Sequence, residues 1–153
     1  MKENVLETTL AAYRQGLFAG TSGNLSLCDE TRGILAITPS SFPYEKMTID
    51  DIMVIRMADG SVVEGPHKPS SEWRMHTAIL KGRPDVFGVV HTHSPCATSF
   101  AVAVGDSLEQ AYLRAVYVED AAKIYSLALG VGGVRRIPDE EVWAMKSRLG
   151  LPR

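Results

Sequence analysis

Two histidines separated by a single residue, His91 and His93, are the side chains of this sequence best suited to chemistry. They follow a largely apolar run over residues 85–90, which predicts a buried strand. Residues at positions i and i+2 of a strand lie on the same face, so both imidazoles point one way. Because zinc and related ions bind imidazole nitrogen, the pair forms half of a metal site. The competing interpretation is two ordinary polar residues at a strand end.

A carboxylate follows two hydroxyl groups in the upstream segment Ser70-Ser71-Glu72. Either serine can cap a helix that starts here, and a carboxylate in the first turn interacts favourably with the helix dipole, so the segment needs no function. A helix N-terminus also attracts anions. Glu72 becomes a candidate for proton transfer if His91 and His93 share its cleft.

Two further segments carry hydroxyl groups where strands begin or end. Gly20-Thr21-Ser22-Gly23-Asn24 combines backbone N–H groups, hydroxyls and a carboxamide, which are donors that suit phosphate. Thr38-Pro39-Ser40-Ser41 is a similar cluster. Each segment alone is more typical of a plain or capped turn. Together with the segment before Glu72, they favour convergence on one phosphate.

The remaining histidines have less specific surroundings. His76 lies four residues after Glu72, so the two can share a helix face, although a helix-surface or core-lining histidine is the favoured interpretation. His67 follows Gly65-Pro66 in a predicted loop and is expected to be solvated.

The elements that must position these groups alternate along the chain. Hydrophobic spacing and capping signals predict helices over residues 3–16, from Ser70 or Ser71 to about residue 82, over 95–103 and 107–129, and from residue 138 onward. Apolar runs between turn residues predict strands over residues 25–27, 34–37, 52–55, 61–63 and 85–90. This alternation indicates an α/β fold.

Length and composition narrow the class of protein. A chain of 153 residues, 45% hydrophobic and 22% charged, predicts one globular domain over residues 1–153. A net charge of -2 without a basic run argues against a nucleic-acid partner. The N-terminus lacks the apolar stretch of a signal peptide, and no apolar run is long enough for a membrane span. Cys28 and Cys96 form no CxxC pair and are expected to be free thiols. We therefore expect a cytoplasmic protein without a membrane partner.

Four segments in this order resemble the class II aldolase/adducin family, which includes L-fuculose-phosphate aldolase and L-ribulose-5-phosphate 4-epimerase. They are Gly20-Thr21-Ser22-Gly23-Asn24-Leu25-Ser26, Ile37-Thr38-Pro39-Ser40-Ser41, Lys68-Pro69-Ser70-Ser71-Glu72 and His91-Thr92-His93-Ser94-Pro95. The similarity extends from the N-terminus to about Ala103. It implies a three-layer α/β/α sandwich around a mostly antiparallel sheet, assembled as a homotetramer with sites near subunit interfaces.

The resemblance also implies a role for each candidate residue. Glu72 would be the carboxylate that transfers the proton. His91 and His93 would bind Zn²⁺ or another divalent ion such as Mn²⁺ or Co²⁺. The substrate phosphate would be bound by Thr21, Asn24, Ser40, Ser41, Ser70 and Ser71.

One part of the family pattern is missing. Family members have a third metal-binding histidine after the first two, in an Asn-His-Gly or His-His-Gly context, and here the chain runs almost directly into the helix predicted from Ser107. An internal deletion after about Ala103 would remove this ligand and at least one strand, leaving an incomplete sheet whose edge needs pairing. A naturally compact variant is the alternative. With only two histidines as ligands, the metal shell would have to be completed by Glu72, His76, water or a neighbouring chain.

The resemblance predicts a metal-dependent sugar-phosphate aldolase of carbohydrate metabolism. This lyase would cleave its substrate in a retro-aldol reaction through a metal-stabilised enediolate, with Glu72 as acid and base. The alternatives are a related sugar-phosphate epimerase or decarboxylase, and a catalytically impaired or non-catalytic binding or scaffold protein like adducin.

Overall fold

The computed structural model describes residues 1–97 and 101–150. The chain divides into two compact units, Met1–Lys123 and Ile124–Arg153. All of the candidate site residues lie in the first unit. The expectation of a single domain over residues 1–153 stays a prediction.

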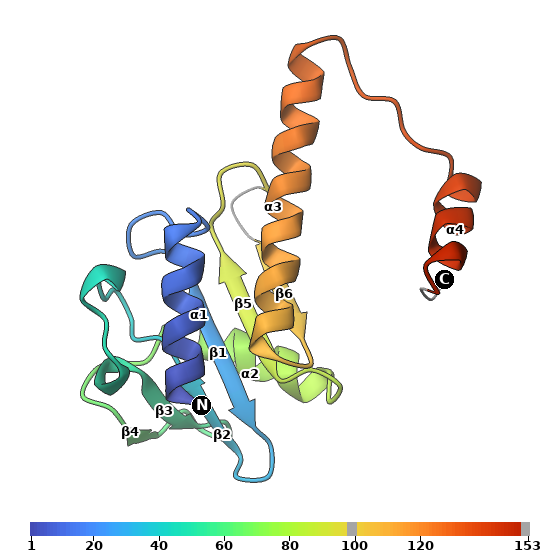
Figure 1. Ribbon diagram of the computed structural model, residues 1–153. Coiled ribbons are helices and arrows are strands. Elements are labelled where there is room, and N and C mark those ends of the chain that lie inside the picture. Colours follow the sequence, from blue (N-terminus) through green and yellow to red (C-terminus); the bar gives the residue numbers. More distant parts are fainter. Residues whose placement is uncertain (98–100, 151–153) are drawn as a thin grey trace. The chain divides into compact units, whose positions relative to one another are not determined.

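An antiparallel sheet forms the centre of the first unit (Figure 1). Within the described residues it has six strands in the order β4-β3-β2-β1-β5-β6, and every neighbouring pair is antiparallel. The strands are β1 (Asn24–Asp29), β2 (Ile34–Ile37), β3 (Met53–Arg56), β4 (Val62–Glu64), β5 (Gly88–Thr92) and β6 (Ala101–Gly105).

The helices agree closely with their predicted ranges. They are α1 (Lys2–Arg14), α2 (Trp73–Gly82), α3 (Leu108–Gly130) and α4 (Asp139–Arg148). Two short 3-10 helices, η1 (Tyr44–Lys46) and η2 (Ile49–Asp51), connect β2 to β3. In the part of the chain that the structure describes, none of the helices has the length and apolar character needed to cross a membrane.

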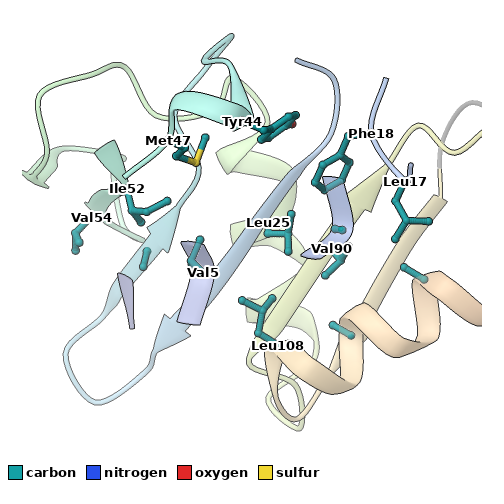
Figure 2. Packing of buried hydrophobic residues seen from close by; sticks show 14 of the residues in the cluster. Val5, Leu17, Phe18, Leu25, Tyr44, Met47, Ile52, Val54, Val90 and Leu108 are labelled. Carbon is teal, nitrogen blue, oxygen red and sulfur yellow. The ribbon is translucent and has the colours of Figure 1, made fainter. Parts of the chain in front are cut away.

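Helices cover both faces of the sheet, which confirms the three-layer α/β/α architecture. In Figure 1, α1 lies in front of the sheet and α2 behind it. Figure 2 shows the front layer, where Val5 of α1 and Leu108 of α3 join Leu25 and Val90 of the sheet. On the other face, Leu80 of α2 belongs to a second cluster with sheet residues that include Val89. Neighbouring residues such as Val89 and Val90 point to opposite faces, so β1, β2, β3, β5 and β6 each contribute to both clusters.

One predicted helix is wrong. Residues 101–103, expected to end a helix that begins at residue 95, belong to strand β6 instead. The alternating sequence Ala-Val-Ala-Val-Gly pairs residue by residue with β5, from Gly88 opposite Gly105 to Thr92 opposite Ala101. This ladder of backbone hydrogen bonds outweighs the helical propensity of alanine. Residues 98–100 of the predicted helix lie outside the described residues. The deletion after about Ala103 stays a prediction.

Candidate active site

Strand pairing brings the first polar groups of the site together. At the edge where β1 begins and β5 ends, Asn24 pairs with His91. Asn24 and Ser26 lie on the same face of β1, because side chains alternate along a strand. Ser26 contacts His76, so this is the face that α2 covers. The site therefore lies between the ends of two central strands and the beginning of a helix.

A chain of short hydrogen bonds links these residues to Glu72. Ser26 Oγ lies 2.6 Å from His76 Nδ1, and His76 Nε2 lies 2.5 Å from Asn24 Oδ1. Asn24 Nδ2 donates to Glu72 Oε2 over 2.5 Å. The favoured interpretation of His76 as a histidine that lines the core is thus consistent with the structure, where its side chain is fully buried.

Glu72 also faces the two histidines that were predicted to bind metal. Its Oε2 lies 3.3 Å from His91 Nε2, and His91 Nε2 lies 3.1 Å from His93 Nε2. The His91 side chain is buried, whereas about a third of the Glu72 side chain (35%) remains exposed. A carboxylate that contacts a buried imidazole and still reaches solvent can exchange protons with a bound molecule.

Burial favours the neutral form of two imidazoles of the site, those of His76 and His91. Burial, and to a lesser extent the charge of His91, lower the pKa of His76 to about 3. Burial also lowers the pKa of His91, an effect that Glu72 opposes and His93 reinforces. Neutral imidazole is the form that binds a metal ion, so His91 is ready to act as a ligand near neutral pH.

Next to Glu72 lies a cavity of about 190 Å³. Its walls include all six residues that the resemblance assigned to phosphate: Thr21, Asn24, Ser40, Ser41, Ser70 and Ser71. Glu72 and His93 complete the wall on the side of the histidines. The structure therefore brings the three hydroxyl-rich segments together, and their role as phosphate ligands stays a prediction.

Backbone pairing joins two of these segments. An isolated antiparallel bridge links Pro39 and Pro69, the Ser40 N–H donates to the Lys68 carbonyl over 2.9 Å, and the Ser70 N–H donates to the Thr38 carbonyl over 3.0 Å. The bridge brings the two segments together, and the serines of both line the cavity.

The start of α2 differs from the prediction. The helix begins at Trp73 with Glu72 in the N-cap position, so neither serine is the cap residue itself. The Ser70 hydroxyl instead accepts a hydrogen bond from the Glu72 N–H over 3.3 Å. Glu72 therefore stands at the junction of the cavity and the helix.

The segment Gly20-Thr21-Ser22-Gly23-Asn24 is held in part by Tyr44, a residue that sequence analysis missed. The Tyr44 hydroxyl lies 2.8 Å from the carbonyl oxygens of both Ser22 and Gly23. Gly23 has a φ of +85°, and a Cβ atom there would lie 2.5 Å from the Phe18 ring and 2.9 Å from the His91 carbonyl oxygen. Only glycine lets the segment approach β5 this closely. An aromatic residue in the segment between β2 and β3 gave no signal of this role.

Ser41 has a left-handed backbone conformation, with a φ of 54°. This region is unfavourable for residues other than glycine, and such strain is concentrated at functional sites. Ser41 lines the cavity, so the unusual backbone conformation supports a functional use of this wall.

The donors fit part of a metal site. Two nitrogens that bind one tetrahedral zinc ion at about 2.1 Å each are separated by about 3.4 Å. The observed 3.1 Å between His91 Nε2 and His93 Nε2 is close to that value. Within residues 1–97 and 101–150, no group of three or more His, Cys, Asp or Glu side chains could hold an ion. The pair can supply two adjacent ligands, and an ion bound here would need others.

His67, which was expected to be solvated, is partly exposed and has two partners. His67 Nε2 lies 2.7 Å from Asp51 Oδ1, and its ring packs against Phe42 with centroids 4.8 Å apart. Its side chain is only a third exposed (33%). The partners come from the segment between β2 and β3, which the local sequence around His67 does not indicate.

Glu119 of α3 is a second residue that sequence analysis missed. Its carboxylate accepts hydrogen bonds from the backbone N–H groups of Cys96 and Ala97, at distances of 2.7 to 3.1 Å. These bonds fix the segment that follows His93. The sequence separation between the partners explains why no local pattern indicated the contact.

Known proteins resemble the chain in sequence and in structure. Over 103 residues it is 44% identical to the L-ribulose-5-phosphate 4-epimerases UlaF of Salmonella paratyphi B and Salmonella typhi; the match covers 67% of this chain and 45% of each relative. The chain thus spans less than half the length of these curated relatives.

Among solved structures, an L-fuculose 1-phosphate aldolase is similar with a TM-score of 0.86 and 25% identity, over 98% of this chain and 96% of the other. The L-fuculose 1-phosphate aldolase from Glaciozyma antarctica PI12 has a TM-score of 0.84 at 17% identity, over 97% and 80% of the two chains, and supports the fold alone.

The match to a protein family covers residues 3–103 and is described as Class II Aldolase and Adducin N-terminal domain. The match ends at residue 103, which is where the similarity inferred from the sequence was expected to end, at about Ala103. The antiparallel sheet between helical layers is the architecture expected from that resemblance. The chain belongs to the class II aldolase and adducin family.

Proposed function

We propose that this protein binds a phosphorylated sugar and reversibly breaks a carbon–carbon bond in it. The observation that carries the proposal is the convergence of three hydroxyl-rich segments, Glu72 and His93 on one cavity. Hydroxyl and amide donors suit a phosphate, and a carboxylate beside them suits proton transfer at the attached sugar. Binding the phosphate would hold the reacting bond in position.

Each group has a distinct task in this proposal. His91 and His93 would hold a divalent ion, which when bound polarises a carbonyl or hydroxyl oxygen of the sugar. The hydroxyl groups of the cavity anchor the phosphate. Glu72 holds or delivers a proton at the carbon next to the carbonyl.

Two reactions share the same bond cleavage. The hydroxyl group beyond the broken bond loses its proton and becomes an aldehyde, while the bonding electrons remain on the carbonyl-bearing fragment as an enediolate. If Glu72 protonates this fragment, both products leave, as in an aldolase. If the aldehyde turns and its opposite face is attacked, the bond forms again with inverted configuration, as in an epimerase.

Epimerisation is the better supported of the two reactions, because the curated relatives at 44% identity are named L-ribulose-5-phosphate 4-epimerases. Aldol cleavage is the second candidate, supported by the similarity to an L-fuculose 1-phosphate aldolase at 25% identity. We further propose a homo-oligomer located in the cytoplasm, as predicted from the sequence.

One experiment tests the proposal. The protein is incubated with Zn²⁺ or Mn²⁺ and either L-ribulose 5-phosphate or L-fuculose 1-phosphate in deuterated water, and the products are followed by NMR. Epimerisation gives D-xylulose 5-phosphate without deuterium at the carbon next to the carbonyl, whereas cleavage gives dihydroxyacetone phosphate that contains deuterium. Binding of both sugars without turnover would support the adducin-like alternative and contradict the enzymatic proposal.

A further inference from the structure

The hydrogen bonds that reach Glu72 from the core can have only one direction. An ionised carboxylate accepts hydrogen bonds and donates none, so the Asn24 group facing Glu72 must be its Nδ2 amide. The Oδ1 atom of Asn24 then faces His76 Nε2, which must carry the proton. His76 Nδ1 is therefore free of a proton in the neutral ring and accepts the hydroxyl hydrogen of Ser26.

Burial separates the four hydrogen-bonded residues, Ser26, His76, Asn24 and Glu72, into two groups. Ser26 and His76 are fully buried at 0% exposure, and neither lines the cavity. Asn24 and Glu72 form part of the cavity wall. A ligand in the cavity can thus contact Glu72 and Asn24, whereas Ser26 and His76 act on it only through them.

Among the residues that the structure describes, two side chains contact the Glu72 carboxylate. Its side chain is 35% exposed, and its contacts through Oε2 are with Asn24 and His91. An exposed carboxylate on a flexible side chain has several rotamers of similar energy. A buried hydrogen-bond donor with a fixed direction, here Asn24, selects one of these rotamers.

We propose that Ser26 and His76 are positioning residues, which hold the Asn24 carboxamide and through it the Glu72 carboxylate in the orientation required for proton transfer. This inference rests on the proposed function and deepens it. Misplacing a reacting group by about 1 Å can reduce a rate by about a hundredfold, so a small rotation of Asn24 would affect turnover. The phosphate is held mainly by the hydroxyl segments, so its binding would change little.

Three variants on α2 test the proposal. His76→Leu removes the donor to Asn24, His76→Gln restores an amide donor near the same place, and Thr77→Val changes a neighbouring buried side chain outside the hydrogen-bond chain. We expect kcat to fall at least about tenfold in His76→Leu, to recover to within about threefold of wild type in His76→Gln, and to remain unchanged in Thr77→Val. The Kd for inorganic phosphate should stay within about twofold in all three.

A folded His76→Leu variant with unchanged kcat would overturn the proposal. So would an equal loss of kcat and phosphate affinity, since that pattern indicates a merely structural role. Circular dichroism of each variant confirms that it is folded.

A second measurement does not depend on turnover. The ¹⁵N spectrum of the His76 ring should show the neutral tautomer with its proton on Nε2, and the side-chain amide signals of Asn24 should move in His76→Leu but not in Thr77→Val. The opposite tautomer, or unchanged Asn24 signals, would overturn the inference. If the wild-type protein turns over no sugar phosphate, the proposed function fails, and these signals alone decide whether the chain of hydrogen bonds exists.

Discussion

At the scale of single residues, the candidate site combines a carboxylate that reaches solvent with two buried imidazoles, those of His76 and His91. Glu72 is partly exposed and contacts both Asn24 and His91, whereas His76 and His91 are buried. The buried rings are neutral near pH 7, because burial lowers the pKa of each. In the proposed function, proton transfer at this site would depend on Glu72, and the imidazoles would serve as metal ligands and hydrogen-bond partners.

Replacing Glu72 by glutamine tests whether Glu72, and not a histidine, transfers the proton. Glutamine has nearly the same shape but cannot accept or deliver the proton, so we expect kcat for the sugar phosphate to fall by about 10² to 10⁴. Sugar-phosphate affinity, measured by isothermal titration calorimetry, should change by less than about fivefold, because the phosphate contacts remain. An active Glu72→Gln protein would show that another group transfers the proton.

The buried His76 predicts a loss of stability in acid. Above pH 6.5 the ring is neutral in both the folded and the unfolded chain, whereas between pH 6.5 and about 3 only the unfolded chain binds the proton. The free energy of unfolding should fall as the pH decreases through this window, by up to about 1.4 kcal/mol per pH unit from this residue.

Urea unfolding at a series of pH values between 7.5 and 4.5 measures this slope. His76→Gln has no titrating ring, so its slope should be smaller by up to about one proton. An equal slope in both proteins would mean that His76 is protonated in the folded state.

At the scale of elements, two close contacts hold the site in place. Gly23 lies against Phe18 and the His91 backbone, which fixes the loop before β1, and Glu119 of α3 binds the segment after β5. Both contacts join segments distant in sequence. The end of β5, which carries His91, and the following segment, which carries His93, are thus fixed from two sides.

Gly23→Ala tests the first contact. The variant combines an unfavourable left-handed backbone with a Cβ atom that meets the Phe18 ring and a carbonyl oxygen. Gly33→Ala is the matched control, since Gly33 has a φ of +63° but open space around its Cβ position. We expect the control to lose about 1 to 2 kcal/mol and Gly23→Ala to lose about 1 to 3 kcal/mol more, measured by urea unfolding. Equal losses would show that the loop moves without cost.

Glu119→Ala tests the second contact. Removing the carboxylate leaves the N–H groups of Cys96 and Ala97 without this acceptor, so their hydrogen exchange should become at least about tenfold faster. Asp120→Ala, an exposed acidic neighbour on the same helix, is the control and should leave both amides protected. Unchanged exchange in Glu119→Ala would mean that other contacts hold this segment.

The elements were predictable to the extent that their signals were local. The range of β2 was predicted without error, because Ile34–Ile37 is a short apolar run between turn residues. Residues 101–103 were misassigned to a helix, because alanine and valine fit either element and the deciding pairing with β5 is not local. The hydroxyl segments and Glu72 were singled out from their residue types and positions, and the family resemblance assigned their roles. The contacts of His76, His67 and Glu119 could not be found, since each depends on a partner distant in sequence.

At the scale of the whole molecule, the first unit leaves apolar surface uncovered. Leu113 and Tyr117, one turn apart on α3, are 47% and 67% exposed, and Val102 on the outer strand β6 is 41% exposed. Unpaired strand edges and exposed apolar side chains are features that subunit interfaces cover. They agree with the homo-oligomer that the family resemblance predicts.

We therefore expect light scattering after size-exclusion chromatography to give a multiple of the 16.7 kDa chain mass. Replacing both Leu113 and Tyr117 by glutamate should shift the protein toward the monomer, because buried charges without partners oppose association. The control is Lys123→Glu on the same helix, which adds negative charge at a position that is already polar and should leave the mass unchanged. A wild-type monomer at all concentrations would contradict the prediction. A stable oligomer of the double variant would instead assign the interface to another surface, such as the edge formed by β6.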